Sequence, residues 1–166
     1  LEHGAGDVHT MYHQLQVLAA SPATPIVRIA DVRRPKVQQI LDSGASGIMF
    51  PQIKSLQEAE DAVRMMRYPP AGIRGTAKMV RATGFGSDFD TYKASLEETL
   101  ESLGHLDTIA GLKGVDVLFV GPSDLTVAMG IAGQITHPDY LNVVKKVAAA
   151  AKTAGKACGV LLLDVE

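Results

Sequence analysis

The chain has 166 residues and a net charge of −2, with 46% of its residues apolar and 20% charged. This composition is typical of one globular domain with its own core, and we expect residues 1–166 to form a single domain. The slightly negative charge gives no sign of nucleic-acid binding, and no apolar run approaches the roughly 18 residues of a membrane span. The single cysteine, Cys158, excludes an internal disulfide, so we expect a cytoplasmic protein that binds neither nucleic acid nor membrane.

Strand-like and helix-like patterns alternate along the chain, which is typical of an α/β fold with parallel strands. In chain order they predict a helix over 9–20, a strand over 24–30, a helix over 35–43, a strand over 47–51, a helix over 55–67, a loop over 75–87, a mostly helical segment over 90–111, a strand over 115–120, a helix over 140–154 and a strand over 157–163. These strands are too few for an eight-stranded barrel, which needs about 250 residues. The pattern alone leaves a small doubly wound sheet and an incomplete barrel open.

Charged or titratable side chains stand at three predicted strand ends. Asp124 follows the strand over 115–120 and a Gly-Pro turn, Arg28 lies in the strand over 24–30, and His3 lies in the strand-like first residues. The carboxyl ends of parallel strands form the reaction face of α/β folds. A carboxylate, an arginine and a histidine on that face predict an enzyme that handles a small anionic substrate.

Two of these residues also have structural explanations. A buried arginine needs an anionic partner, which for Arg28 is either a substrate or an ion pair with Asp31 or Asp42. His3 lies in a loop of small residues, where a histidine suits acid–base chemistry but is often only part of the surface. The sequence leaves both alternatives open.

Glu98 is the first candidate partner of Asp124 in a metal site. Two carboxylates, completed by waters and substrate oxygens, suit a hard divalent cation. The flanking Glu97 and Glu101 are instead typical of a solvated helix face, which is the competing interpretation.

The remaining polar candidates carry weaker signals. His9 and His13 fit the polar face of a helix, because no His-Glu-x-x-His pattern accompanies them. The segment 74–78, Arg-Gly-Thr-Ala-Lys, could hold an anion through its backbone amides and its charge. A Schiff-base mechanism would need a desolvated lysine, for which Lys54 and Lys78 are the candidates.

Four sequence runs stand out together: Leu-Glu-His-Gly at 1–4, Val-Arg at 27–28, Arg-Tyr-Pro-Pro-Ala-Gly-Ile-Arg-Gly at 67–75 and Gly-Pro-Ser-Asp-Leu at 121–125. In combination they resemble the class II, metal-dependent pyruvate aldolases of the HpcH/HpaI type. The resemblance implies a TIM (β/α)8 barrel and a homo-oligomer, usually a hexamer. It also implies a lyase that cleaves a 4-hydroxy-2-oxo acid to pyruvate and an aldehyde through a metal-stabilised pyruvate enolate.

The resemblance also implies roles for individual residues. It makes Glu98 and Asp124 the ligands of Mg²⁺ or Mn²⁺, with Co²⁺ as a further candidate, and His3 the catalytic base. The substrate contacts that it implies are Arg28, Gly121, Pro122 and Ser123.

The chain departs from the family pattern in ways that affect these expectations. The aspartate that would orient His3 is absent before Leu1, and the apolar strand expected ahead of Glu98 is replaced by a polar stretch. We therefore expect an incomplete barrel that lacks the first and last strands and residues between about Glu97 and Glu98. Competing hypotheses are a non-catalytic oxo-acid-binding relative, a Schiff-base aldolase using Lys54 or Lys78, and, with less support, a lyase that acts on acyl-CoA esters.

Overall fold

A computed structural model of the protein describes residues 6–95 and 106–161. Its elements alternate between helices and strands, which confirms the predicted α/β class. In chain order they are α1 (Val8–Leu18), β1 (Ile26–Arg28), α2 (Arg34–Asp42), β2 (Gly47–Met49), α3 (Leu56–Met66), the 3-10 helix η1 (Arg81–Gly86), α4 (Phe89–Ser95), α5 (Leu106–Ala110), β3 (Val117–Val120), α6 (Pro122–Ala128), α7 (Pro138–Thr153) and β4 (Ala157–Val160).

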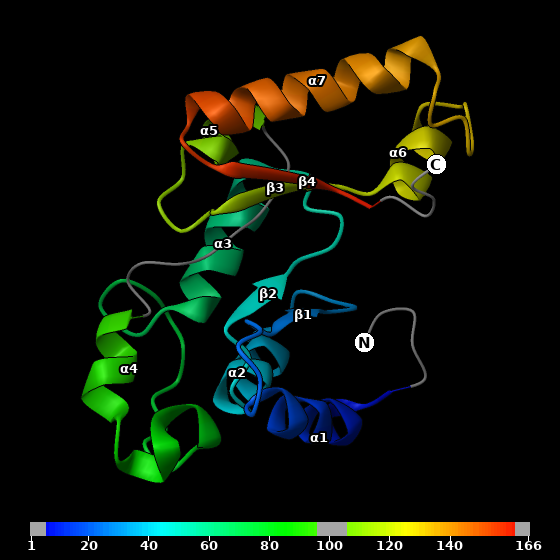
Figure 1. The fold of residues 1–166 in the computed structure, drawn as a ribbon. Coiled ribbons are helices and arrows are strands. Elements are labelled where there is room, and N and C mark those ends of the chain that lie inside the picture. The colour runs from blue at the N-terminus through cyan, green and yellow to red at the C-terminus, as the bar shows by residue number, and fades with distance from the viewer. Residues whose placement is uncertain (1–5, 96–105, 162–166) are drawn as a thin grey trace.

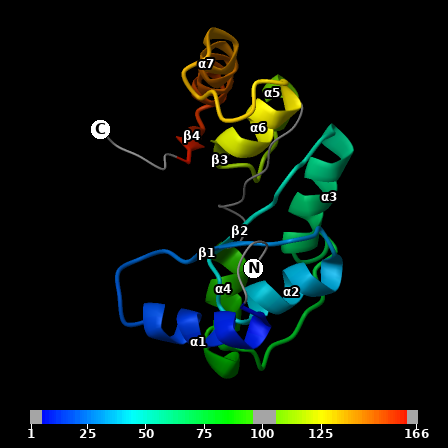
Figure 2. The same ribbon diagram turned by 90° about the vertical axis from the view of Figure 1, so that its right-hand side faces the viewer.

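The strands form two parallel pairs. In the first pair β1 lies beside β2, with Arg28 opposite Met49, and in the second β3 lies beside β4, with Val120 opposite Val160. Figure 1 shows α1 and α2 packed below the first pair, and α5 and α7 covering the second. Turned by 90°, Figure 2 shows α3 running between the two groups of elements. The described residues thus contain two separate sheets and no closed barrel.

Helix α2 illustrates how the apolar pattern builds the core. The spacing of Val37, Ile40 and Leu41 places them on one face of the helix, and all three are fully buried. The helix ends at Ser43, and Gly44 follows with φ of 97°, the left-handed conformation that glycine adopts without strain. The helix predicted over 35–43 is therefore confirmed, within one residue at each end.

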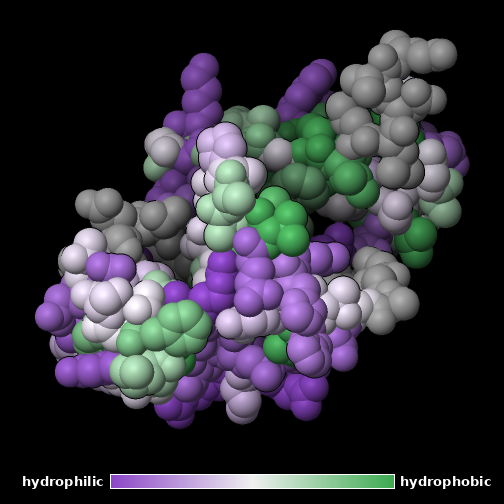
Figure 3. Space-filling view, turned by 60° about the horizontal axis from the view of Figure 1, so that its bottom comes forward, coloured by the Kyte–Doolittle hydropathy of each residue, from purple (hydrophilic) through white to green (hydrophobic). Residues whose placement is uncertain are grey.

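Helix α1 begins at a side-chain cap. The carboxylate of Asp7 accepts hydrogen bonds from the backbone amide of Thr10 at 2.8 Å and from its hydroxyl at 3.0 Å. Met11 and Leu15 are buried, whereas Leu18, which is spaced for the same helix face, is 37% exposed. The buried face of α1 therefore ends before Leu18. Figure 3 shows hydrophobic clusters among hydrophilic side chains on the surface seen from below.

Two helical segments were not predicted. The sequence indicated a Gly-Pro turn at 121–122 followed by Asp124 and no helix here, but Pro122–Ala128 forms helix α6. Proline suits the first turn of a helix because its fixed φ is helical and its missing N–H needs no partner there. The expected loop over 75–87 likewise contains η1, which carries Arg81 bonded to the carbonyls of Leu15 and Ser43. Those two contacts are long-range, so the local sequence could not indicate them.

The Arg-Tyr-Pro-Pro run shapes the fold. Gly72 packs so closely on the carbonyls of Arg64 and Arg67 that a side chain there would clash. The chain then returns along α3, where the amide of Ile73 donates to the Arg64 carbonyl at 2.7 Å. This return delivers Arg74 into the interior.

Arg74 is 1% exposed and has three partners. Its guanidinium donates to the Asp42 carboxylate at 2.7 Å and to the Tyr92 hydroxyl at 3.1 Å, and it lies 4.7 Å from the ring centre of Tyr68. Burial raises the pKa of the Tyr68 hydroxyl. Arg74 therefore has a structural role, in place of the anion contact considered for the segment 74–78.

Candidate active site

A cavity of about 350 Å³ opens where the carboxyl ends of three strands meet. It is bounded by the end of β1, the end of β2 with the segment that follows, the end of β3, and parts of α5, α6 and α7. Its lining residues are Arg28, Met49, Phe50, Pro51, Gln52, Ile53, Leu106, Phe119, Val120, Gly121, Asp124, Leu125, Val143 and Val147. The cavity therefore lies on the face where the strand-end argument expects chemistry.

Arg28 reaches this cavity as the last residue of β1. The strand is held in register by the amide of Ile29, which donates to the carbonyl of Met49 at 3.2 Å, and the Ile29 side chain is fully buried. The two carboxylates considered as structural partners of Arg28 hold other arginines. Asp31 accepts from Arg33 at 2.6 Å, and Asp42 accepts from Arg74 at 2.7 Å.

Asp124 reaches the same cavity from the first turn of α6. Gly121 precedes the helix as its N-cap, and a side-chain carbon on Gly121 would lie 3.9 Å from a carboxylate oxygen of Asp124. An acidic side chain in the first turn is favoured by the positive end of the helix dipole. Helix α6 is anchored from below by the buried Thr126, which donates to the Pro122 carbonyl at 2.8 Å and accepts from the Gly133 amide at 3.0 Å.

The predicted substrate contacts at 121–123 divide into two groups. Gly121 lines the cavity, whereas Pro122 is buried and Ser123 is exposed, and neither belongs to the cavity wall. Contact of Pro122 and Ser123 with a substrate stays a prediction. The structure thus brings together Arg28, Gly121 and Asp124 from two strand pairs.

Two predicted site residues, His3 and Glu98, lie outside the described residues. In the described part of the chain there is no group of three or more His, Cys, Asp or Glu side chains that could hold a metal ion. Asp124 supplies one hard oxygen donor at the cavity, which is the donor type that Mg²⁺ and Mn²⁺ prefer. Asp124 therefore fits one ligand position of such a cation, and Glu98 as the second ligand stays a prediction.

The lysines considered for a Schiff base do not line the cavity. Lys54 and Lys78 are both exposed, and neither is among the described residues that line it. The ammonium of Lys78 lies 5.3 Å from the ring centre of Phe89, which is not a cavity residue either. Because an amine must be desolvated to act as a nucleophile near neutral pH, neither lysine fits that role.

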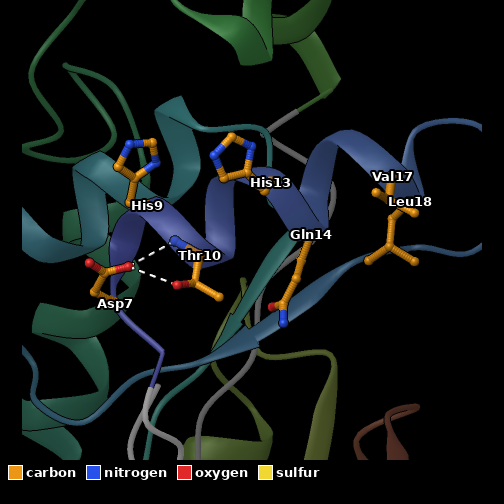
Figure 4. A pocket seen from close by; sticks show the side chains of 7 residues that line it. All are labelled: Asp7, His9, Thr10, His13, Gln14, Val17 and Leu18. Carbon is orange, nitrogen blue, oxygen red and sulfur yellow. Dashed lines mark hydrogen bonds between the residues drawn. The ribbon is translucent and has the colours of Figure 1, made fainter.

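A second hollow lies on α1 and has a different character. Figure 4 shows its seven lining side chains, all from the helix and its cap: Asp7, His9, Thr10, His13, Gln14, Val17 and Leu18. The rings of His9 and His13 stack with their centres 5.0 Å apart, and both side chains are exposed. The exposure of both histidines confirms the predicted polar face of the helix. No residue at the end of a strand is among the described residues that line this hollow.

One polar residue in the strand-end cavity was missed by the sequence argument. Gln52 lies just beyond β2, in a Pro-Gln-Ile-Lys segment that carries no charge at this position. The sequence signal that could have found it is its place three residues after the end of a buried strand. Apart from Arg28 and Asp124, it is the only polar side chain among the described residues that line the cavity.

The match to known proteins extends over all of residues 1–166, which fit the HpcH/HpaI aldolase/citrate lyase family. The chain belongs to this family. It is 37% identical over 172 aligned residues to a hydroxypyruvate/pyruvate aldolase of Pseudomonas aeruginosa, covering 98% of this chain and 64% of that protein. It is 38% identical over 168 residues to a 5-keto-4-deoxy-D-glucarate aldolase of Salmonella arizonae, covering 96% of this chain and 66% of that protein.

The fold is shared with a solved member of the family. A crystal structure of an HpcH/HpaI aldolase/citrate lyase family protein from Burkholderia cenocepacia J2315 superposes with a TM-score of 0.88 at 38% identity. That alignment covers 98% of this chain and 69% of the other. The chain thus spans about two thirds of the length of these relatives. Within the residues that the structure describes, no helix has the length and apolarity needed to cross a membrane.

Proposed function

We propose that the protein is a divalent-metal-dependent aldolase that cleaves a 4-hydroxy-2-oxo acid to pyruvate and an aldehyde. The observation that carries this proposal is the meeting of Arg28 and Asp124 in one cavity at the carboxyl ends of β1 and β3. The relatives named as hydroxypyruvate/pyruvate and 5-keto-4-deoxy-D-glucarate aldolases support the same reaction class. Strand-end geometry and family membership therefore favour one chemistry.

We further propose that the two parallel strand pairs are segments of a TIM (β/α)8 barrel. Each pair is parallel, and helices cover it on one side, as in β/α units of a barrel. A barrel also accounts for a cavity that is lined by the carboxyl ends of strands from both pairs. A hexameric assembly stays a prediction from the family resemblance.

The proposed mechanism needs charge stabilisation at one oxygen of the substrate. In cleavage, the 4-hydroxyl loses its proton, the bond between C3 and C4 breaks, and its electron pair forms the enolate of pyruvate while C4 becomes the aldehyde carbon. Protonation at C3 then completes pyruvate. A divalent cation held by Asp124 and Glu98 would act as a Lewis acid that stabilises the negative charge on the 2-oxo oxygen.

The residues of the chain perform the other parts of this reaction. Arg28 adds a fixed positive charge beside the developing enolate oxygen, which lowers the energy of the transition state. His3 is proposed to remove the 4-hydroxyl proton as a general base. The apolar wall, which includes Met49, Phe50 and Val120, lies beside these charges, and apolar surroundings strengthen the interactions between charges.

Exchange of the pyruvate methyl protons in D₂O, followed by NMR, tests this proposal without an aldehyde. We expect exchange with Mg²⁺ or Mn²⁺, loss of exchange with EDTA, and a loss of about 100-fold or more in Asp124→Asn, because one metal ligand is weakened. Asp139→Asn is the matched control, since Asp139 also follows a proline in the first turn of a helix but lies outside the cavity.

Two other outcomes would overturn the proposal. Proton exchange that survives EDTA, together with a covalent pyruvate adduct of the protein after borohydride treatment, would indicate a lysine imine. Binding of pyruvate or oxalate without exchange, in folded protein with metal, would indicate a non-catalytic oxo-acid-binding relative.

A further inference from the structure

Gln52 is the one neutral polar side chain in the wall of the candidate active site. Among the described lining residues only Arg28, Gln52 and Asp124 are polar, and the other side chains are apolar or absent. Binding sites of this kind use a few placed polar groups to orient a ligand and to select it. Arg28 and Asp124 face the pyruvate half in the proposed function, which leaves Gln52 without an assigned partner in the substrate.

The backbone at Gln52 is in an unusual conformation. Its φ is 52°, in the left-handed region that residues with a side chain rarely adopt and that costs of order 1–3 kcal/mol. Among the described residues the only other non-glycine with positive φ is Phe85, which lies in η1 and does not line the cavity. A glycine would take this conformation with less strain, so the chain keeps a side chain here against a local cost.

The segments on both sides of Gln52 hold it in this conformation. Phe50 and Ile53, its buried neighbours, are each 8% exposed. The amide of Lys54 donates to the Glu58 carboxylate at 2.7 Å, and the Ser55 hydroxyl accepts from the Glu58 amide at 3.1 Å. This pair of bonds fixes the start of α3 in the manner of a Ser-x-x-Glu capping box.

These anchors determine where the side chain lies. Figure 1 shows the segment between β2 and α3 rising from the first strand pair toward the second. Gln52 lines the cavity together with Phe119 and Val120 of β3. Its side chain is exposed, so core packing does not explain why a strained residue occupies the position.

We propose that Gln52 binds a hydroxyl group of the aldehyde half of the substrate, so that the site prefers hydroxylated aldehydes to their deoxy counterparts. This inference rests on the proposed aldolase function and adds a substrate class to it. A primary amide donates through its nitrogen and accepts through its oxygen, so it matches a hydroxyl, which does both. It carries no charge, so it does not compete with Arg28 for the enolate oxygen of the pyruvate half.

An aldehyde that lacks the hydroxyl cannot form a hydrogen bond with the Gln52 amide, which then faces an apolar wall with one hydrogen bond fewer. Sites built around such a bond reject analogues that lack the hydroxyl. Because Gln52 is exposed, water replaces part of the lost interaction, and we expect a preference of about tenfold, the value of one net hydrogen bond.

Aldol addition of pyruvate to glycolaldehyde and to acetaldehyde tests the inference, since the two aldehydes differ by one hydroxyl. In the intact protein with Mg²⁺ or Mn²⁺, we expect kcat/KM to favour glycolaldehyde about tenfold. Gln52→Met keeps the length of the side chain without its amide, and Gln52→Gly removes the side chain and relieves the positive φ. Both should bring the ratio of the two kcat/KM values close to one.

Gln57→Met is the matched control, because Gln57 is exposed on α3 and does not line the cavity. It should keep the ratio of the unmodified protein. Thermal unfolding of Gln52→Gly provides a second measurement, and we expect a melting temperature at or above that of the unmodified protein because the strain is gone.

The pyruvate exchange assay distinguishes a failure of the proposed aldolase function from a failure of the role given to Gln52. If the unmodified protein shows no metal-dependent exchange, the proposed function fails. If exchange is present but the aldehyde ratio stays the same in Gln52→Met and Gln52→Gly, the role of Gln52 is wrong. An unmodified protein with no preference for glycolaldehyde would also overturn it.

Discussion

Arg28 is the last residue of β1 and lines the candidate active site. Among the described residues that line this cavity, it is the only one with a cationic side chain. A lysine at this position keeps the charge but loses the planar guanidinium, which offers two parallel donors to an oxyanion. We expect Arg28→Lys to lower the rate of pyruvate methyl exchange by about 10- to 100-fold, which is less than the roughly 100- to 1000-fold loss on removing a whole donor at a developing oxyanion, because the positive charge is kept. The melting temperature should change little, since the side chain is only half-buried.

Arg33→Lys provides the comparison for this change. Arg33 is an exposed arginine five residues later, and it pairs with Asp31 at the surface. Its replacement should leave exchange as it was. An Arg28→Lys variant with the full exchange rate would show that only a diffuse positive charge is needed, and the assigned contact to the enolate oxygen would then be wrong.

At the residue scale, the sequence could indicate the charged site residues but not the neutral one. Arg28 and Asp124 stand out because a charge beside an apolar strand needs an explanation, and strand ends supply one. Gln52 has no such signal, because its positive φ is imposed by the burial of Phe50 and Ile53 on either side. Conformations of this kind depend on packing rather than on the local residue type.

At the scale of elements, the Arg74 ion pair connects three segments. The guanidinium is fully buried, Asp42 comes from α2, and Tyr92 comes from α4. Asp42→Ala would leave a buried charge without its anion, and we expect it to lower the free energy of unfolding by about 3–5 kcal/mol. Urea unfolding followed by circular dichroism measures this change.

Two further variants make that measurement decisive. Asp42→Asn keeps an acceptor for the guanidinium and should lose less stability than Asp42→Ala. Asp31→Ala removes the exposed partner of Arg33 and should cost less than about 1 kcal/mol. Equal losses in Asp42→Ala and Asp31→Ala would contradict a special role for the buried pair.

The buried ion pair between Arg74 and Asp42 also explains why the role of the segment 67–75 was hard to predict from the sequence. An arginine beside glycines, such as Arg74, suggests an anion site. Its hydrogen-bond partners in the fold, Asp42 and Tyr92, lie 32 and 18 positions away in the sequence. Helices with regular apolar spacing, such as α2, were predicted within one residue at each end. Helix α6 was missed because it is short and its burial depends on Thr126 and Gly133, which no periodic pattern connects.

At the scale of the whole molecule, the alternation of elements predicted the α/β class and parallel pairing. Both strand pairs are parallel, and the four strands begin within two residues of their predicted positions, although each is shorter than predicted. Which strands pair could not be predicted, because β3 and β4 are separated by two helices in the sequence. Pairing of this kind depends on long-range packing, whereas alternation is visible locally.

The stability of the whole molecule should also depend on pH through Asp116, next to the start of β3. Burial raises the pKa of its carboxyl, while Lys156 and Arg67 act in the opposite direction, and one carboxylate oxygen is buried without a hydrogen bond. A pKa that is raised on folding favours the folded state fully below the unfolded value, near pH 4, and this contribution is lost as the pH rises through the folded value. At neutral pH, ionised Asp116 is therefore destabilising relative to a neutral side chain.

Asp116→Asn should consequently raise the free energy of unfolding at pH 7 by a few tenths to about 1 kcal/mol, a modest gain because solvent screens the half-buried group. The backbone carbonyl of residue 116 still accepts from Ala157 at 2.9 Å, so the link between β3 and β4 remains. Urea unfolding from pH 3.5 to 7.5 should show the gain shrinking as the pH falls and disappearing near pH 4, where the carboxyl is protonated in both states. Asp107→Asn, which removes an exposed charge from the first turn of α5, should give no such gain. A gain in Asp116→Asn that is independent of pH would mean that packing, and not the buried charge, is responsible.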